Sequence, residues 1–402
     1  MTNLHVEPIC ADKEDETLYT SKKVSVDGKS IITPIVAYDV KLIRGNELVA
    51  PATKGLNEIY QKMGTQKVPI KTLMNNMKAE KDFDARLQTK YNKTDAAREI
   101  NMCILESEAL TYPLGTELDY VLDTTYLTSD IVPLPNFPLV TSRIDSDSMF
   151  FEYTTFLANA ISHLQKFKDK KPIMGVIPKI AWEHTEKLVE FYIQNGLNAF
   201  YVDFAARNSI TAKRDFLHVF RVLSSHDALD SSFLYAYNVD AGRLAKTADV
   251  VNAKDIVSFG FGFDAMGRKH TRVKAKPEVW RRINTLPNRI RMFNRKDYGY
   301  YKILNIEKIK GIYPQDSCLP MDKFTKSFSS NVSELRRCEN LFNSEQLGLE
   351  AYNLKHVIKN DRPVDYLSRK TYVKKQYIKM MKNFKNAIAR GNPRGSLKEW
   401  FG

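Results

Sequence analysis

The 402-residue sequence lacks most of the features that mark exported, membrane-bound or nucleotide-binding proteins. Its four cysteines are widely spaced and form no CxxC pair, which argues against a disulfide scaffold and fits a reducing cytoplasm. No apolar run reaches the about 18 residues of a membrane span, and no charged-then-apolar signal begins the chain. No GxGxxG or GxxxxGKS/T follows an apolar segment. We therefore expect a cytoplasmic protein with no membrane contact and no glycine loop for a nucleotide.

Positive charge is concentrated in two parts of the chain, whose net charge is +14. Residues 268–310 hold 14 Lys and Arg against 3 acidic residues, and residues 354–402 hold 13 against 3. In the first of these segments aromatic residues such as Trp280, Tyr298 and Tyr300 stand between the basic ones. This pattern predicts a face that binds a polyanion such as nucleic acid. Solvated helix faces with core aromatics between them are the alternative.

Short apolar segments separated by helical patterns dominate the middle of the chain. Residues 173–178, 199–205, 233–242 and 256–264 are nearly unbroken apolar runs, which is typical of strands buried on both faces of a parallel sheet. The residues between them have apolar side chains at helical spacing. Repeated strand–helix–strand units predict an α/β fold, either an open doubly wound sheet or an irregular (β/α)8 barrel of the TIM type.

Aspartates that follow the strand candidates favour the barrel. Barrel enzymes place catalytic groups at the carboxyl ends of several different strands. Four such positions in this sequence carry an aspartate: Asp123, Asp203, Asp240 and Asp264. For each of them taken alone, the alternative is a helix cap or a turn.

The chain is expected to have three parts. Residues 1–22 are polar and acidic and predict a flexible tail. Residues 23–36 read as two strands joined by an Asp-Gly turn, a hairpin that would close the bottom of the barrel. The catalytic barrel would then extend over 23–310. Residues 311–402 would pack helices on it, including a basic amphipathic helix near the carboxyl end.

Four segments, in the same order, resemble the tRNA-guanine transglycosylase superfamily. They are GKSIITPIV at 28–36, YVLDTTYL at 120–127, the strand–helix–strand pair at 172–205, and YPQDSCLPM followed by LGLEAYNL. The resemblance implies an enzyme that exchanges guanine in nucleic acid for a 7-deazaguanine base through a covalent aspartyl-glycosyl intermediate. It also implies a target base displaced from the stack and a basic platform for the flanking backbone.

Two catalytic carboxylates follow from the resemblance. Asp264, in an FD pair like that of the family, is the expected nucleophile, with Asp255 or Ser258 as alternatives. Asp84 precedes an REI segment and is the expected proton-handling carboxylate, with Asp82 as its alternative. Two carboxylates acting at one anomeric carbon follow the same chemical logic as retaining glycosidases.

Substrate contacts are implied as well. Asp123 matches the family's base-recognition aspartate, which would accept two hydrogen bonds from the guanine-like edge. The family's glutamine and glycine pair are absent here, so Asp203 is expected to supply a lost polar contact. Gly262 would allow a tight strand end near the ligand. The expected nucleic-acid-binding residues are Arg268, Lys269, Arg272, Lys274, Arg281, Arg282, Arg289, Arg291, Lys374, Lys375 and Lys379.

The structural zinc site of the family is eroded in this chain. Its ligand positions carry Asp316, Cys318, Met321 and Tyr352, and one good ligand in four cannot hold zinc tetrahedrally. We therefore expect neither a metal nor a cofactor. Because family members often form dimers through this region, a homodimer or a partner subunit stays open.

DNA is the expected substrate. Compact relatives encoded by phages and bacterial islands insert 7-deazaguanines such as preQ0 into DNA, whereas archaeal tRNA enzymes usually append a further RNA-binding domain, for which this sequence has no length. One alternative is a tRNA-guanine transglycosylase with the same chemistry. Another is a non-catalytic paralogue that binds nucleic acid or docks on a catalytic partner subunit.

Overall fold

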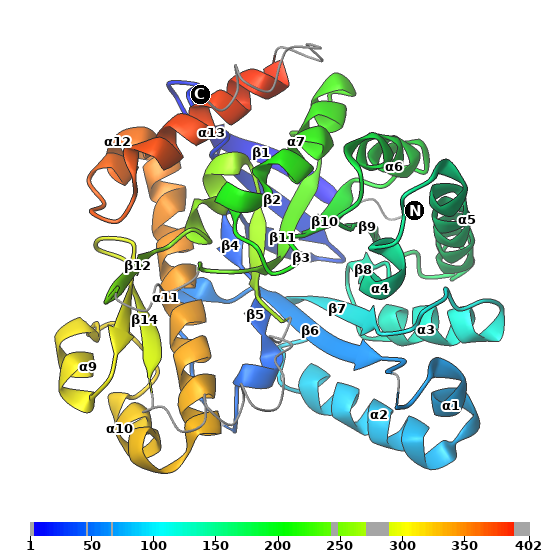
Figure 1. Ribbon diagram of the computed structural model, residues 1–402, viewed down its shortest axis with the longest axis horizontal. Helices are drawn as coiled ribbons and strands as arrows, with labels where there is room; N and C mark the ends of the chain where they lie inside the picture. The colour runs from blue at the N-terminus through cyan, green and yellow to red at the C-terminus, as the bar shows by residue number, and fades with distance from the viewer. Residues whose placement is uncertain (1–3, 46, 66, 243–247, 271–288, 390–402) are drawn as a thin grey trace.

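The computed structural model describes the chain except for residues 1–3, 46, 66, 243–247, 271–288 and 390–402. Parallel strands occupy the centre of the molecule, and most helices lie outside them (Figure 1). The predicted α/β class is therefore confirmed. Among the described residues, no helix combines the length and the apolar character needed to cross a membrane.

The parallel strands belong to two sheets. The six-stranded sheet has the order β4 (Ile35–Val36), β13 (Ala265–Arg268), β11 (Phe233–Val239), β10 (Ala199–Asp203), β9 (Ile173–Ile177) and β8 (Val132–Pro133). The three-stranded sheet has the order β5 (Tyr38–Asp39), β6 (Leu56–Met63) and β7 (Ile100–Ser107). Every pairing within both sheets is parallel.

The two parallel sheets adjoin at both of their edges. At one edge, the short strands β4 and β5 follow each other directly, and β4 pairs with β13 while β5 pairs with β6. At the other edge, Glu106 of β7 forms a parallel bridge with Asn136, which lies just beyond β8. The backbone N–H of Asn136 donates to the carbonyl oxygen of Leu105 there (2.9 Å). The carboxyl ends of these strands consequently meet on one side of the molecule.

The strands β9, β10 and β11 confirm the first three predicted strands, and every residue in them is buried. The fourth prediction, at 256–264, is wrong, because this segment forms the 3-10 helix η3 (Ile256–Phe261) and the strand starts only at Ala265. Gly262 ends η3 with a φ of 94°, a left-handed conformation that glycine adopts without strain. An apolar run alone cannot distinguish a buried helical turn from a buried strand.

Helices connect most of the successive parallel strands and cover them from outside (Figure 1). The longer ones are α2 (Met77–Tyr91), α3 (Thr116–Leu127), α5 (Asp147–Leu164), α6 (Trp182–Gln194) and α7 (Ser209–Ser225). Shorter ones are η1 (Val40–Leu42), η2 (Pro51–Thr53), α1 (Ile70–Asn75) and α4 (Pro138–Thr141).

The strand predicted to end at Asp123 is wrong, because residues 120–127 form the second half of α3. The hydroxyl groups of Thr124 and Thr125 donate to the carbonyl oxygens four residues earlier, at 2.7 Å and 3.0 Å. These bonds satisfy the hydroxyls within the helix. The β-branched pair, which favours a strand in isolation, is therefore accommodated in the helix.

An antiparallel sheet at the amino end contains β1 (His5–Ala11), β2 (Thr20–Val26) and β3 (Lys29–Ile32). The predicted hairpin is confirmed in β2 and β3, whose turn at Asp27 and Gly28 has positive φ angles of 48° and 75°. Part of the expected tail forms β1 and pairs with β2. Because most side chains of β1 are exposed, its sequence has no apolar run that would predict a strand.

A second antiparallel sheet and a group of helices complete the carboxyl-terminal part. The strands are β12 (Val250–Asn252), β14 (Ile290–Asn294) and β15 (Gly299–Ile303). The helices are α9 (Ile306–Ile312), α10 (Met321–Ser330), α11 (Val332–Asn360), α12 (Pro363–Ser368) and α13 (Lys375–Ala389). The long helix α11 packs on β14 and β4, and α13 packs on α7 (Figure 1). Thus α11 forms a wall beside the six-stranded sheet.

Candidate active site at the carboxyl ends of the parallel strands

Asp264 lies at the amino end of β13, away from the carboxyl ends of the strands. Its buried Oδ2 accepts hydrogen bonds from Lys22 Nζ (3.2 Å) and from the backbone N–H of Leu234 (2.8 Å). The enclosed ammonium group of Lys22 also donates to the carbonyl oxygens of Leu229 and Ser232. Burial raises the pKa of Asp264, and Lys22 opposes that shift. This ion pair joins β2 to the amino ends of β11 and β13, so we interpret Asp264 as structural.

The other carboxylates implied by the resemblance lie on outer helices. Asp84 and its alternative Asp82 are exposed on α2. Asp123 is half-exposed on α3 and contacts His163 of α5 at 2.9 Å. The structure does not bring Asp84 and Asp264 together, because one faces solvent on an outer helix while the other is enclosed at the strand ends.

The helix η3 contains the alternatives to Asp264. Asp255 caps η3 and accepts a hydrogen bond from the hydroxyl of Tyr300. The Ser258 hydroxyl contacts that of Ser209. Gly262 lies beside the ring of Phe220 at the end of η3. These residues support the turn into β13 and do not reach Asp203.

Asp203 lies at the carboxyl end of β10, where it is buried. Its Oδ1 accepts hydrogen bonds from the backbone N–H of Ala205 (2.7 Å) and from Asn238 Nδ2 (3.2 Å), and its Oδ2 accepts one from Asn136 Nδ2 (2.9 Å). Burial raises the pKa of Asp203, while these N–H donors act in the opposite direction. Asn238, with a φ of 60°, also accepts a hydrogen bond from the backbone N–H of His270 (3.0 Å). One asparagine thus joins the ends of β10, β11 and β13.

A second carboxylate, Glu106 of β7, lies near Asp203 and is absent from the sequence-based candidates. Its Oε1 accepts a hydrogen bond from the hydroxyl of Tyr60 (3.1 Å), and its Oε2 one from Tyr237 (3.4 Å). Burial raises the pKa of Glu106; the Lys62 ammonium, 3.6 Å away, opposes this shift and the charge of Asp203 adds to it. Glu106 therefore keeps its proton to a higher pH than an ordinary glutamate does.

A buried polar network supports Glu106. Glu58 of β6 contacts both His270 and the hydroxyl of Tyr235, and all three side chains are enclosed. The imidazole of His270 stacks on the ring of Tyr60, with centroids 4.0 Å apart. Because the Tyr60 hydroxyl donates to Glu106, the network fixes the orientation of that carboxyl group. A catalytic group held in one orientation loses little freedom during a reaction.

Gly267 of β13 provides space for this network. A Cβ atom at this position would overlap the hydroxyl of Tyr235 and lie 2.7 Å from Glu58 Oε2. Both neighbours are fully buried, so Gly267→Ala is expected to cost about 1–3 kcal/mol through overpacking and to lower the unfolding temperature by several degrees. Thermal unfolding followed by circular dichroism measures the effect. Gly311→Ala, where a Cβ meets no atom within 4 Å, is the control, and equal losses in the two variants would contradict the prediction.

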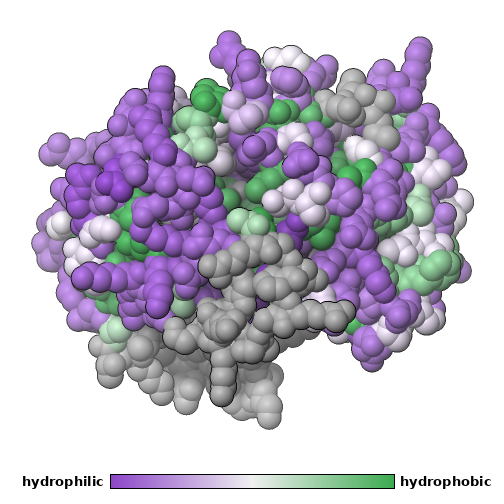
Figure 2. All heavy atoms as spheres, turned by 90° about the horizontal axis from the view of Figure 1, so that it is seen from above, coloured by the Kyte–Doolittle hydropathy of each residue, from purple (hydrophilic) through white to green (hydrophobic). Residues whose placement is uncertain are grey.

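The expected nucleic-acid-binding residues lie in separate places. Those that line a pocket between β11, β13 and α11 are Arg268, Lys269 and Arg291. Those that are exposed around the start of α13 are Lys374, Lys375 and Lys379. Arg289 is exposed just before β14, while Arg272, Lys274, Arg281 and Arg282 lie outside the described residues. Figure 2 shows that the face seen from above, over α7 and α13, is predominantly hydrophilic with small apolar patches.

The positions that the resemblance assigns to zinc ligands have other contacts. Asp316 accepts a 2.6 Å hydrogen bond from Arg295, and Cys318 is an exposed free thiol. Met321 begins α10, and Tyr352 is exposed on α11. In the part of the chain that the structure describes, no group of three or more His, Cys, Asp or Glu side chains is arranged to hold a metal ion.

Comparisons with known proteins do not identify a family. No family model matches the chain, and no curated protein is significantly similar to it. Among solved structures, the enoyl reductase domain of MlnA from the macrolactin biosynthesis cluster of Bacillus amyloliquefaciens is 8% identical in sequence. The match covers 83% of this chain and 94% of that chain, with a TM-score of 0.28. Such a low TM-score indicates neither a shared fold nor a shared function.

Proposed function

We propose that the parallel strands form an irregular (β/α)8 barrel, and that Glu106 and Asp203 at its carboxyl end exchange guanine for a 7-deazaguanine base in DNA. Two parallel sheets that adjoin at both edges, with helices between most of the successive strands, support the barrel. The observation that carries the enzymatic assignment is the pair of buried carboxyl groups at the carboxyl ends of β7 and β10. Catalytic groups of barrel enzymes lie at these ends.

Two carboxyl groups in unlike surroundings suit displacement at an anomeric carbon. Burial raises the pKa of Asp203, and its N–H donors oppose that shift. In its ionised form, Asp203 attacks C1′ and forms a C–O bond while the bond from C1′ to guanine breaks. Glu106, with its raised pKa, gives its proton to the departing base. The incoming 7-deazaguanine then attacks C1′ and loses a proton to the ionised Glu106, while Asp203 leaves as a carboxylate.

A nucleic-acid substrate is supported by charge. The chain carries a net charge of +14, and Arg268, Lys269 and Arg291 line a pocket at the carboxyl ends of β11 and β13, and β11 is the strand next to β10. A target base must leave the stack to reach such a site, so the backbone beside it requires a basic surface. The preference for DNA over tRNA rests on the resemblance to compact enzymes that modify DNA.

Exchange of radiolabelled guanine into duplex DNA and, in parallel, into bulk tRNA tests this function. We expect label to enter DNA. Label entering tRNA alone would instead assign the same chemistry to tRNA. If neither substrate takes up label although both bind in a salt-sensitive manner, the chain is a binding protein or depends on a partner subunit.

Glu106→Gln is expected to lower the exchange rate by about 10²-fold, because the amide cannot carry the proton. The wild-type rate should fall with rising pH as Glu106 loses its proton, at a higher pH than for an ordinary glutamate, since burial raises its pKa. This alkaline limb should be absent in Glu106→Gln. Glu108→Gln, which alters the neighbouring carboxylate bound to Lys62, is the control. Equal losses in the two variants, or a retained limb in Glu106→Gln, would contradict the assignment.

A further inference from the structure

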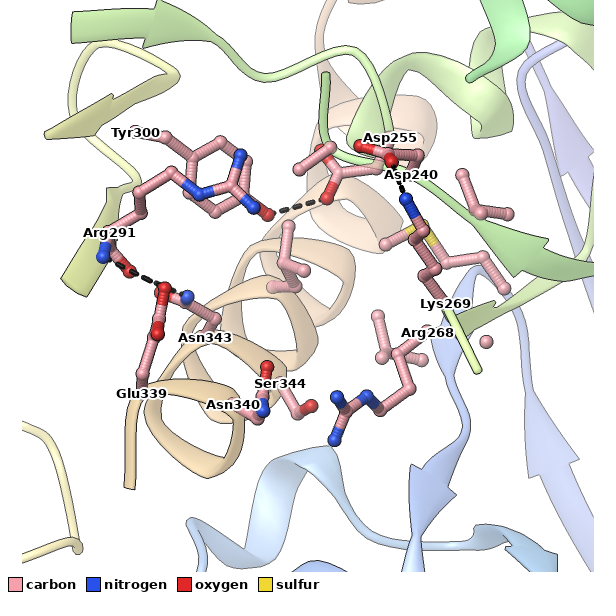
Figure 3. Close-up of a pocket in the computed structure, with 16 residues that line it drawn as sticks. Asp240, Asp255, Arg268, Lys269, Arg291, Tyr300, Glu339, Asn340, Asn343 and Ser344 are labelled. Atoms are coloured by element: carbon pink, nitrogen blue, oxygen red, sulfur yellow. Dashed lines mark hydrogen bonds and ion pairs between the residues drawn. The ribbon is translucent and has the colours of Figure 1, made fainter. Parts of the chain in front are cut away.

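A small polar pocket lies beside the candidate active site, between the carboxyl ends of β11 and β13 and helix α11 (Figure 3). Its volume is about 110 Å³. Gly267 belongs to its wall and also borders the Glu58 network, so the pocket and the candidate active site share strand β13. Arg291 and Tyr300 close the pocket from the side of β14 and β15. A group bound here would therefore be separated by Gly267 from the buried network that orients Glu106.

The carboxylates of this pocket already have partners. The pairs are Asp240 with Lys269, Asp255 with Tyr300, and Glu339 with Arg336. Two of these carboxylates also accept hydrogen bonds from the backbone. The N–H of Gly242 donates to Asp240 (2.7 Å), and the N–H of Arg291 donates to Glu339 (2.9 Å). These acidic groups therefore do not require a cation from solvent.

Donors on the facing walls lack such partners. The guanidinium of Arg268 makes no hydrogen bond to any described residue, and its ion-pair partner Asp39 is 3.7 Å away and shared with Lys41 (2.9 Å). Within the described ranges, the side chains of Asn340 and Ser344 on α11 also make no hydrogen bond. Figure 3 shows the guanidinium of Arg268 extending toward these two side chains. A guanidinium, an amide and a hydroxyl of the described residues thus lie on facing walls of one pocket.

Arg291 supplies a second positive charge to the pocket. Its Nη1 donates to the carbonyl oxygen of Gly242 (2.8 Å), and its guanidinium lies 5.9 Å from the centre of the Tyr300 ring. Among the described residues, no carboxylate pairs with this guanidinium. Two guanidinium groups, together with neutral donors and with acids that already have hydrogen-bond or ion-pair partners, favour an anion with several oxygen acceptors.

We propose that this pocket binds a phosphate group. The Arg268 side chain is 23% exposed, so an anion can reach it from solvent. The source of this phosphate is inferred from the proposed function. It belongs to the nucleic-acid backbone next to the displaced nucleotide, where it would fix the register of the strand. Phosphate as a free ion shares the same chemistry, and the experiment below separates the two sources.

Isothermal titration with inorganic phosphate tests the pocket in the full chain. We expect saturable binding by the wild type, which Arg268→Gln weakens by about tenfold through loss of a charged donor. Ser344→Ala should weaken it by about threefold while leaving the charge unchanged. Arg369→Gln removes an equal charge from an exposed arginine of the Asp361 pair and should have no effect. The absence of saturable binding, or binding equal in Arg268→Gln and Arg369→Gln, would overturn the proposal.

Competition between phosphate and a fluorescent single-stranded oligonucleotide identifies the source of the group. Displacement of the oligonucleotide by phosphate, weakened in Arg268→Gln and in Ser344→Ala, supports a backbone phosphate; saturable phosphate binding without competition supports a free ion in the same pocket. Glu106→Gln separates this proposal from the proposed function, because it should lower exchange by about 10²-fold and retain phosphate binding. If the wild type exchanges no base but binds phosphate through Arg268, only the proposed function fails.

Discussion

Asp203→Asn is expected to abolish the covalent glycosyl-enzyme adduct and to lower base exchange by at least about 10³-fold. An amide oxygen is a much weaker nucleophile than a carboxylate, so the first step is lost. The substitution preserves the size of the side chain, and its oxygen can still accept a hydrogen bond from the backbone N–H of Ala205. Intact-protein mass spectrometry of enzyme mixed with DNA detects the adduct, and radiolabelled guanine measures the exchange.

Asp215→Asn is the matched control for this substitution. Asp215 lies on α7 and pairs with Arg207 on the outside of the strands, so its neutralisation should leave both the adduct and the exchange rate intact. An adduct that persists in Asp203→Asn would show that another side chain attacks C1′. If peptide mapping then placed it on Asp264, the nucleophile implied by the sequence resemblance would be correct and our interpretation of Asp264 as structural would be wrong.

Asp264→Ala is expected to lower the free energy of unfolding by about 3–5 kcal/mol, because it leaves the Lys22 ammonium buried without its counter-ion. Urea denaturation followed by circular dichroism measures this loss as a lower midpoint. The double variant Lys22→Met with Asp264→Leu should recover most of it, since apolar side chains replace both charges. This prediction distinguishes a structural ion pair from a catalytic carboxylate.

Two comparisons complete the test of Asp264. Asp365→Ala breaks an exposed pair with Arg362 and should cost about 1 kcal/mol or less. Asp264→Asn keeps the acceptor for the backbone N–H of Leu234 and should retain base exchange below its unfolding temperature. A variant that stays as stable as the wild type yet loses exchange would contradict the structural role.

The strands β9, β10 and β11 could be predicted from the sequence because strands buried on both faces appear as short unbroken apolar runs. The same criterion failed at η3, whose Ile256–Phe261 segment is just as apolar but turns as a helix before β13 begins. The criterion also missed a real strand, β1. Hydrogen bonds to β2 stabilise this strand, and most of its side chains are exposed. An apolar run indicates that a segment is buried. Whether that segment is a strand or a helix depends on the elements that pack against it.

The candidate site was only partly accessible to sequence reasoning. Asp203 could be predicted as a substrate contact, though not as a nucleophile, because it lies toward the carboxyl end of an apolar run. Glu58 and Glu106 lie within β6 and β7, and only the structure brings them to His270 and Asp203. The signal that could have identified them is an acidic residue within an apolar strand, since a carboxylate buried there requires specific partners.

Asn238 has a mechanical consequence for the proposed chemistry. Its amide nitrogen holds Asp203, while its oxygen holds the backbone N–H of His270, just beyond the end of β13. A pull on the chain at His270 would therefore turn this amide and take one N–H away from Asp203. Because that donor favours the anion, its loss would raise the proton affinity of Asp203 and weaken it as a nucleophile. The position of one strand end would in this way influence the proposed nucleophile on a neighbouring strand.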